Sequence, residues 1–303
     1  MDRIRLAAVS RNYFNMPLWV AVHCGLFDDE GLDVAVELHE PIDAVSRRLE
    51  DGRVDLAYGV TEHVILDRES GGHTMIIGGK VNKLPFSFIA GKDIRSFEDL
   101  RGRTVGVSSR NAGSSSLVMK LMAAHGLEYP RDYAIEEVGP ILARWEKLKS
   151  GEIQAGLQGA PLNYIAVDEG FRTLCEPRDE FPDFQFASLH VDTRWADAKP
   201  DLMARFMRAF VRAHRRFFAD RETMIRIAMA ETGVAEKYAA AAWDEYTAAE
   251  IFPRDGDVNS AGVQALIDIS GLIRALPNRQ GQSAEAYIDR RHLRTAWAET
   301  AGE

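Results

Sequence analysis

The sequence predicts an α/β protein made of two similar units in tandem, followed by a helical C-terminal region. Three observations indicate this fold class. Short apolar strand-like runs alternate with helical periodicity through the first two thirds of the chain, part of the sequence recurs at a spacing of 99 residues, and the last third is nearly all helical in pattern. Alternating strands and helices favour a mostly parallel sheet flanked by helices in each unit.

The repeat depends on several weak matches that share one spacing. Ser10–Asn12 recurs as Ser109–Asn111, in each case after a strand-like run and before a helix. The run LEDGRVDLAYG from Leu49 corresponds to LKSGEIQAGLQG from Leu148, with leucine, glycine and β-branched positions kept. Because the matches keep their order and spacing, we expect two units that each fold as strand–helix–strand–helix–strand.

In the first unit, the run RLAAV reads as a strand, and the helix expected after it contains Leu18. A second helix and strand follow in the run that begins at Leu49. Ligands of open α/β sheets bind beyond the carboxyl ends of strands, near helix N-termini. The ends of these strands in the first unit are Asn12–Asn15 and Gly59–Thr61.

The second unit begins with RTVGVSSRNAGSSSLVMKLMAAHGL, in which Thr104–Val107 reads as a short buried strand. Helical spacing of apolar residues begins at Leu117, and Gly126 ends it. Ser114–Ser116 therefore lie at or near a helix N-terminus, where unpaired N–H groups attract an anion. The alternative is an ordinary serine cap. The corresponding strand ends are Ser108–Ser114 and Gln158–Ala160.

Two strands are expected to link the units as a hinge. The first alternates through Phe86, Phe88 and Ala90, and the second begins at Phe184. The helix from Pro200 should bury one stripe, made of Leu202, Met203, Phe206, Met207, Phe210 and Phe217. Further helices are expected around 234–250, 259–275 and 283–298. The expected domain ranges are 1–88 and 188–303 for the first lobe and 89–187 for the second.

Composition excludes several classes of protein. A net charge of -9 without an extended basic stripe argues against nucleic-acid binding, and no apolar run is long enough to span a membrane. Cys24 and Cys175 are the two cysteines, and each reads as a buried small hydrophobe. No metal-ligand spacing and no cofactor motif is found. The N-terminal sequence lacks an apolar secretory segment, so we expect a periplasmic protein if a leader was removed and a cytoplasmic one if Met1 is the native start.

The runs PLWVAVHCGLFDDEGLDVAV, LEDGRVDLAYG, FEDLRGRTVGV, LKSGEIQAGL and AYIDRRHL resemble one known family over nearly the whole chain. It is the sulfonate-, nitrate- and taurine-binding, thiamine-pyrimidine-synthase-like branch of the type II periplasmic-binding-protein fold. The resemblance implies a hinged, two-lobed receptor that closes on a small anionic or aromatic molecule in the cleft between its lobes. It also implies an ABC permease as the partner.

The same branch contains cytoplasmic enzymes, which keeps a second class of function open. His63 stands where the pyrimidine synthases of the family have a functional histidine, but their cofactor-binding lysine would fall at Gly59 and their cysteine-rich motif is missing. Desulfinases of this fold use a cysteine nucleophile, for which Cys24 is the nearest candidate; its place in a helix indicates packing instead. The alternative function is thus a decarboxylase, a desulfinase or a precursor-biosynthesis enzyme.

The candidate site residues come from the four strand ends and from the start of the hinge. Arg11 and Arg110 occupy equivalent places, where an arginine could hold a sulfonate or carboxylate through paired hydrogen bonds. Each candidate has a structural alternative: surface charge for the arginines, turn or cap chemistry for the polar residues, and core packing for the aromatic ones. The residues expected to bind ligand are Asn12, Tyr13, Phe14, Thr61, Asn82, Ser108, Ser109, Arg110, Asn111, Gly113, Ser114, Gly159 and Ala160.

These side chains favour recognition over catalysis, because they offer few acids, bases or nucleophiles. We therefore expect a monomeric solute-binding protein of an ABC uptake system that binds a sulfonate, a carboxylate or a related organic anion. The expected partners are the small-molecule ligand and a permease, with no nucleic acid, no cofactor and no metal.

Overall fold

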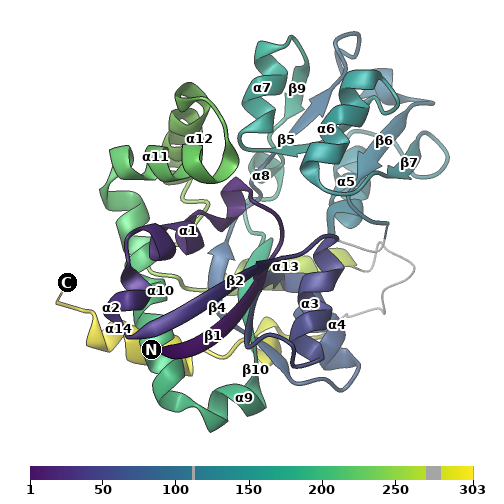
Figure 1. Cartoon of the computed structure of the whole chain (residues 1–303). Helices are drawn as coiled ribbons and strands as arrows, with labels where there is room; N and C mark the ends of the chain where they lie inside the picture. Colours follow the sequence, from purple (N-terminus) through teal and green to yellow (C-terminus); the bar gives the residue numbers. More distant parts are fainter. Residues whose placement is uncertain (111–112, 271–280, 303) are drawn as a thin grey trace. The chain divides into compact units, whose positions relative to one another are not determined.

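A computed structural model describes the chain except residues 111–112, 271–280 and 303. The chain divides into two compact units (Figure 1). Unit 1 comprises Met1–Lys83, Gln185–Val263 and Ser283–Glu303, and unit 2 comprises Leu84–Phe184 and Gln264–Gln282.

The sheet of unit 1 has five strands in the order β2-β1-β3-β10-β4. Its central strand, β3, is parallel to β1 and antiparallel to β10. Strands β3, β4 and β10 are buried along nearly their whole length, with α1 and α10 on one side of the sheet and α3 on the other (Figure 1). The strands are β1 (Asp2–Ala8), β2 (Leu32–Leu38), β3 (Leu56–Val60), β4 (Thr74–Val81) and β10 (Ala187–Asp192).

The sheet of unit 2 repeats this topology in the order β7-β6-β8-β5-β9. Strand β5 is antiparallel to both of its neighbours, as β10 is in unit 1. The strands are β5 (Phe86–Ala90), β6 (Thr104–Val107), β7 (Ala134–Glu137), β8 (Ala155–Gly159) and β9 (Arg172–Cys175). The predicted α/β class, with mostly parallel sheets flanked by helices, is confirmed.

The sequence repeat corresponds to a structural repeat. Strands β3 and β8 begin and end 99 residues apart, and α3 (Ile42–Glu50) and α6 (Ile141–Ser150) begin at the same spacing. The remaining helices of the repeat are α1 (Met16–His23), α2 (Leu26–Asp29), α4 (Thr61–Glu69), α5 (Gly113–Ala124) and α7 (Leu162–Asp168). The structure thus gives each strand end of unit 1 an equivalent in unit 2.

The C-terminal third is helical, as predicted. Helix α10 buries the whole expected stripe from Leu202 to Phe217 against unit 1. The helices of this region, with the short α8 that precedes it, are α8 (Pro177–Glu180), α9 (Thr193–Ala198), α10 (Pro200–Ala219), α11 (Arg221–Thr232), α12 (Glu236–Ala248), α13 (Ser260–Ser270) and α14 (Arg291–Glu299). Short 3-10 turns cover Tyr13–Asn15, Glu98–Leu100 and Ala284–Tyr287. None of the described helices combines the length and the apolar character needed to cross a bilayer.

Two expectations differ from the structure in this region. The helix expected at 283–298 begins only at Arg291. A 3-10 turn covers Ala284–Tyr287, and after it Ile288 is extended and bridges to Ile76, while the amide of Asp289 donates to the Ile76 carbonyl. The described residues 264–270 group with unit 2, whereas the expected first lobe included them in the range 188–303. Within unit 2, Asp268 and Ile269 lie beside α5 around one surface hollow.

Candidate ligand-binding site

The carboxyl end of β1 is shaped by a buried asparagine. Asn15 is inaccessible to solvent, and its side-chain amide donates to the carbonyl oxygens of Val9 and Ser10 at 2.9 Å each. These bonds hold the turn that leads from β1 into α1. The remaining polar atom, Asn15 Oδ1, accepts a hydrogen bond from Lys80 Nζ at 2.6 Å.

Lys80 is a buried ammonium group in unit 1 that the sequence reasoning missed. Ala187 pairs with Val81 and Ser188 pairs with Gly79, so Lys80 is the extra residue of a β-bulge in β4. Bulges redirect side chains and are common beside functional sites. The Lys80 Nζ lies 4.9 Å from the centre of the Tyr58 ring, and Lys80 is 2% exposed.

Burial lowers the pKa of Lys80 to about 7. Its polar contacts among the described residues are one neutral oxygen and one aromatic face, and no carboxylate pairs with it there. A buried ammonium without a counter-charge is costly, so the region around Lys80 favours an anion. The sequence signal was a lysine inside the otherwise apolar run TMIIGGKV.

Thr61 is part of a buried hydroxyl–imidazole chain. Its Oγ1 lies 2.9 Å from Ser188 Oγ, which in turn lies 2.7 Å from His190 Nε2. Burial is the main cause that lowers the pKa of His190 to about 3, so the ring is neutral at physiological pH. The Thr61 hydroxyl is thus already bonded inside the sheet.

His63 also lies in unit 1. Its Nδ1 forms a hydrogen bond with Ser46 Oγ at 2.6 Å. Burial lowers the pKa of His63. A Cβ at Gly59, where the pyrimidine synthases would have their lysine, would lie 2.8 Å from His190 Cε1. The structure therefore leaves no room at residue 59 for that lysine.

The aromatic candidates of unit 1 pack into its interior. The ring centre of Tyr13 lies 4.8 Å from that of Tyr246 and 6.5 Å from that of Phe252, and Tyr13 is fully buried. Phe14 packs edge-on against Phe186, with ring centres 5.9 Å apart. In the described structure both rings are buried packing residues.

Two candidate asparagines also have structural bonds. Asn82 Nδ2 donates to the Asp257 carbonyl at 2.7 Å, and its Oδ1 accepts from Gln185 at 2.9 Å. Asn12 makes only a long contact, 3.4 Å from Nδ2 to the Val9 carbonyl. Its buried Oδ1 has no partner in the described part of the chain, which leaves Asn12 as an acceptor or amide available at the end of β1.

In unit 2 the strand β6 and the start of α5 lie where the sequence placed them. Ser115 Oγ donates to the Ser109 carbonyl at 2.6 Å and closes the turn. Ser114 Oγ is buried and has no partner within the described residues. Ser108 precedes this turn, Gly113 is the first residue of α5, and Asn111 lies outside the described residues.

Gly159 is the last residue of β8 and pairs with Phe86 of β5. Ala160 follows it and is 1% exposed. Both residues therefore contribute backbone at the end of β8.

The two candidate arginines are engaged elsewhere. Arg110 is exposed; its Nη2 donates to the Ile135 carbonyl at 3.0 Å, and its backbone amide donates to Glu137. Arg11 forms an ion pair with Glu231 and lies over the Trp19 ring. Both arginines were expected to donate paired hydrogen bonds to an anion. Contacts within the protein already occupy some of these N–H donors.

The cysteines show no activation. Cys24 caps the end of α1, and burial is the main cause that raises the pKa of its thiol. Burial also raises the pKa of Cys175, to about 12. A thiol with a raised pKa is a poor nucleophile, so the structure supports packing roles for both.

Arg144 is the second cation that the sequence reasoning missed. It lies on α6, is 1% exposed, and its Nε and Nη1 have no hydrogen-bond partner among the described residues. Burial lowers its pKa to about 10, so the guanidinium is still charged at neutral pH. The sequence signal was available in the repeat, where the equivalent residue, 99 positions earlier, is Val45.

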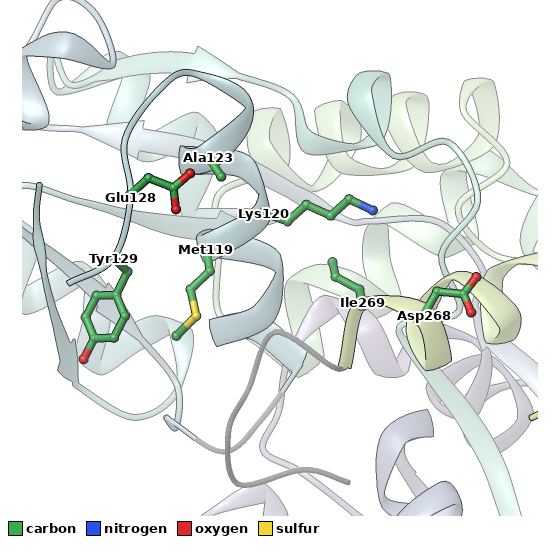
Figure 2. A pocket seen from close by; sticks show the side chains of 7 residues that line it. All are labelled: Met119, Lys120, Ala123, Glu128, Tyr129, Asp268 and Ile269. Atoms are coloured by element: carbon green, nitrogen blue, oxygen red, sulfur yellow. The ribbon is translucent and has the colours of Figure 1, made fainter. Parts of the chain in front are cut away.

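A surface hollow of about 330 Å³ lies on the outer side of α5 in unit 2 (Figure 2). Figure 2 shows Lys120 extending from α5 on the side that faces Ile269. Lys120 and Asp268 are exposed, so this hollow does not bury a charged group. We therefore place the candidate site at the strand ends and not in this hollow.

The fold and the polar strand ends define a class: the chain has the type II periplasmic-binding-protein fold. Each of its two sheets contains one strand antiparallel to its neighbours, β10 in unit 1 and β5 in unit 2. The sequence model described as NMT1/THI5-like matches residues 12–223. The chain belongs to this family. No curated protein matches it in sequence.

Solved structures of the same fold cover nearly the whole chain. The ligand-binding component of an ABC-type import system from Staphylococcus aureus, with zinc bound, has a TM-score of 0.81 at 13% identity and covers 98% of this chain and 99% of its own. The alkanesulfonate-binding protein SsuA from Xanthomonas axonopodis pv. citri, bound to MOPS, has a TM-score of 0.76 at 17% identity (96% and 99%). The nitrate-binding protein NrtA from Synechocystis PCC 6803 has a TM-score of 0.79 at 15% identity (99% and 89%).

Proposed function

We propose that this protein is a solute-binding protein that captures a small organic anion at the carboxyl ends of its strands. The observation that carries the proposal is Lys80, a buried ammonium group with no carboxylate partner in the described structure. An anion supplies the missing counter-charge, and its oxygens accept hydrogen bonds from the ammonium. The same proposal names an ABC permease as the partner, a monomer as the state, and the extracytoplasmic side of the membrane as the location.

A sulfonate or a carboxylate is the favoured ligand class. The ammonium stands over the Tyr58 ring, and among the described residues its hydrogen bond is to Asn15 Oδ1. A charged group on an organic body fits such surroundings better than a fully hydrated inorganic ion. The SsuA and NrtA structures, whose names describe alkanesulfonate and nitrate binding, support an anion in this fold.

Binding without chemical change fits the side chains better than catalysis. Burial lowers the pKa of His190 to about 3 and raises the pKa of the Cys175 thiol to about 12. A general base or nucleophile would need a pKa nearer the working pH. These groups therefore support recognition.

The test is calorimetric titration of the protein with ethanesulfonate, benzenesulfonate, benzoate and nitrate, and with neutral benzyl alcohol, at one ionic strength. At least one organic anion should bind with one site per chain, and the alcohol should not. Replacing Lys80 with Met should weaken that binding about 10- to 100-fold. The matched control is Lys199→Met, an exposed lysine of the same unit, which should leave affinity unchanged.

Two results would contradict the proposal. Binding of neutral compounds alone would remove the anion as ligand. New product signals in a proton NMR time course, with the bound compound consumed, would replace a binding protein with an enzyme.

A further inference from the structure

The side chain of Arg144 lies across two bare strand backbones in unit 2. Gly106 of β6 and Gly156 of β8 are paired in register. A Cβ at Gly156 would lie 2.8 Å from Arg144 Cδ, and one at Gly106 would lie 3.5 Å from Arg144 Cγ. The two glycines thus leave the space that the arginine stem occupies.

Unit 1 fills the equivalent place with an apolar cluster. Val45 of α3 packs there with Ala7 and Ala57, and these two alanines are paired in register on β1 and β3. The cluster in unit 1 is Ala7, Val45, Leu49, Val54 and Ala57, and the residues 99 positions later are Gly106, Arg144, Leu148, Ile153 and Gly156. One valine and two alanines are therefore replaced by one arginine and two glycines.

This comparison separates packing from function. The same helix-on-sheet contact folds in unit 1 with no charge, so the fold does not require a cation at residue 144. Burying a guanidinium there without a partner lowers stability relative to an apolar residue of matching volume. Nε and Nη1 of Arg144 have no partner in the described part of unit 2, so the arrangement lacks the acceptor that a guanidinium needs.

We propose that Arg144 is an anion-binding residue of unit 2, which takes the carboxylate or sulfonate group of the ligand through its planar guanidinium. The proposal rests on the proposed function, in which Lys80 of unit 1 supplies one positive charge, and adds a second positive charge in unit 2. Arginine suits this role because its fork of N–H donors matches two oxygens of one carboxylate or sulfonate. Gly106 and Gly156 serve as positioning residues, since they hold the arginine stem against the sheet.

The first experiment compares Arg144→Met with Arg103→Met. Arg103 is an exposed arginine just before β6, so both variants remove one positive charge from unit 2. Titration with ethanesulfonate and benzoate should show a loss of about 100-fold or more for Arg144→Met. Arg103→Met should stay within twofold of the unchanged protein.

The second experiment rebuilds the apolar cluster of unit 1 in unit 2. The variant combines Gly106→Ala, Arg144→Val, Ile153→Val and Gly156→Ala; the third change is needed because a Cβ at residue 106 meets Ile153 Cδ1. Without ligand, this variant should unfold at the same temperature as the unchanged protein or at a higher one, and it should not be stabilised by ethanesulfonate or benzoate. If Arg144 had only a structural role, the rebuilt variant would instead unfold at a lower temperature than the unchanged protein.

The outcomes separate this inference from the proposed function. If the unchanged protein binds neither anion, the proposed function fails, and with it the inference. If it binds one of them and Arg144→Met binds that anion within twofold, the inference is overturned while the proposed function stands. A rebuilt variant that loses stability but still responds to the anion would also overturn the inference.

Discussion

Lys80 Nζ of β4 and Asn15 Oδ1 at the start of α1 lie 2.6 Å apart, in a region where both side chains are buried. The contact joins two strand ends that are 65 residues apart in sequence. The amide oxygen of Asn15 is neutral, so this contact gives the ammonium no counter-charge, and a charged acceptor would stabilise it more.

The first prediction concerns pH and folding stability. The pKa of Lys80 is about 7 in the folded protein, against 10.5 for a lysine in water. Between these values the unfolded chain holds a proton that the folded chain lacks, so the free energy of unfolding rises as pH increases from 7 to 10.5. Below pH 7 both states are protonated and this contribution stays constant.

Lys80→Met removes that dependence. Chemical denaturation from pH 6 to pH 10 should show that the variant is more stable than the unchanged protein by a few kcal/mol at pH 6 to 7, with the difference narrowing as pH rises. Equal slopes with pH for the two proteins would show that Lys80 keeps an ordinary pKa. Lys199→Met is the control, and its slope should match that of the unchanged protein.

The second prediction links pH to binding. An anion beside Lys80 favours the ammonium form and raises its pKa, so binding at pH 8 to 9 should take up protons. Calorimetry of ethanesulfonate in two buffers of different ionisation enthalpy measures this uptake directly. Affinity should fall as pH rises above 7, and binding that is independent of pH from 7 to 9 would place the anion away from Lys80.

The third prediction tests the anchoring role of Asn15. Asn15→Ala removes two part-buried donated bonds and one buried accepted bond, and should lower the free energy of unfolding by about 2 to 4 kcal/mol. The matched control is Asn12→Ala, because Asn12 makes a single contact that is 3.4 Å long. This substitution should lower the free energy of unfolding by less than about 1 kcal/mol. Urea denaturation of both variants checks the difference, and similar losses would contradict it.

The fourth prediction concerns the close approach of Gly59 and His190. A Cβ at residue 59 would lie 2.8 Å from Cε1 and 3.0 Å from Nδ1 of the imidazole, so Gly59→Ala should destabilise unit 1 by about 1 to 3 kcal/mol. Combining it with His190→Ala removes the clash. The double-mutant cycle should therefore give a coupling energy of about 1 kcal/mol or more, and additive losses would show that the two residues do not compete for space.

The sequence allowed the fold to be predicted in detail because the repeat and the hydrophobic periodicity both depend on local spacing. Thr104–Val107 is a strand in the structure as predicted, and the helix that follows Ser109 begins at Gly113. The helix expected from residue 283 begins only at Arg291, because a long-range bridge between Ile76 and Ile288 follows the 3-10 turn at Ala284–Tyr287 and interrupts the helix. Such a contact leaves no local pattern.

The candidate site was harder to predict, because burial of a charge depends on tertiary packing. Lys80 and Arg144 look like ordinary charged residues in the sequence, and only the bulge in β4 and the glycine pair under α6 explain their positions. Tyr13 was expected near a ligand because it follows a strand, but the rings of Tyr246 and Phe252 come from the distant C-terminal region and enclose it.

The last prediction separates Arg110 from Arg144. Arg110 follows β6 directly, which made it the natural anion-binding candidate in the sequence, but its Nη2 donates to the Ile135 carbonyl and the residue is exposed. An exposed guanidinium keeps its hydration and contributes little when an anion binds, whereas a desolvated one contributes much more. Arg110→Ala should therefore change the affinity for ethanesulfonate or benzoate less than threefold, against about 100-fold for Arg144→Met.

Titrations of both variants at 20 mM and 200 mM salt complete the test. The small effect of Arg110→Ala on affinity should shrink further at high salt, because exposed charges are screened, and the effect of Arg144→Met should persist. A loss for Arg110→Ala that equals or exceeds the loss for Arg144→Met would move the anion to the exposed turn after β6.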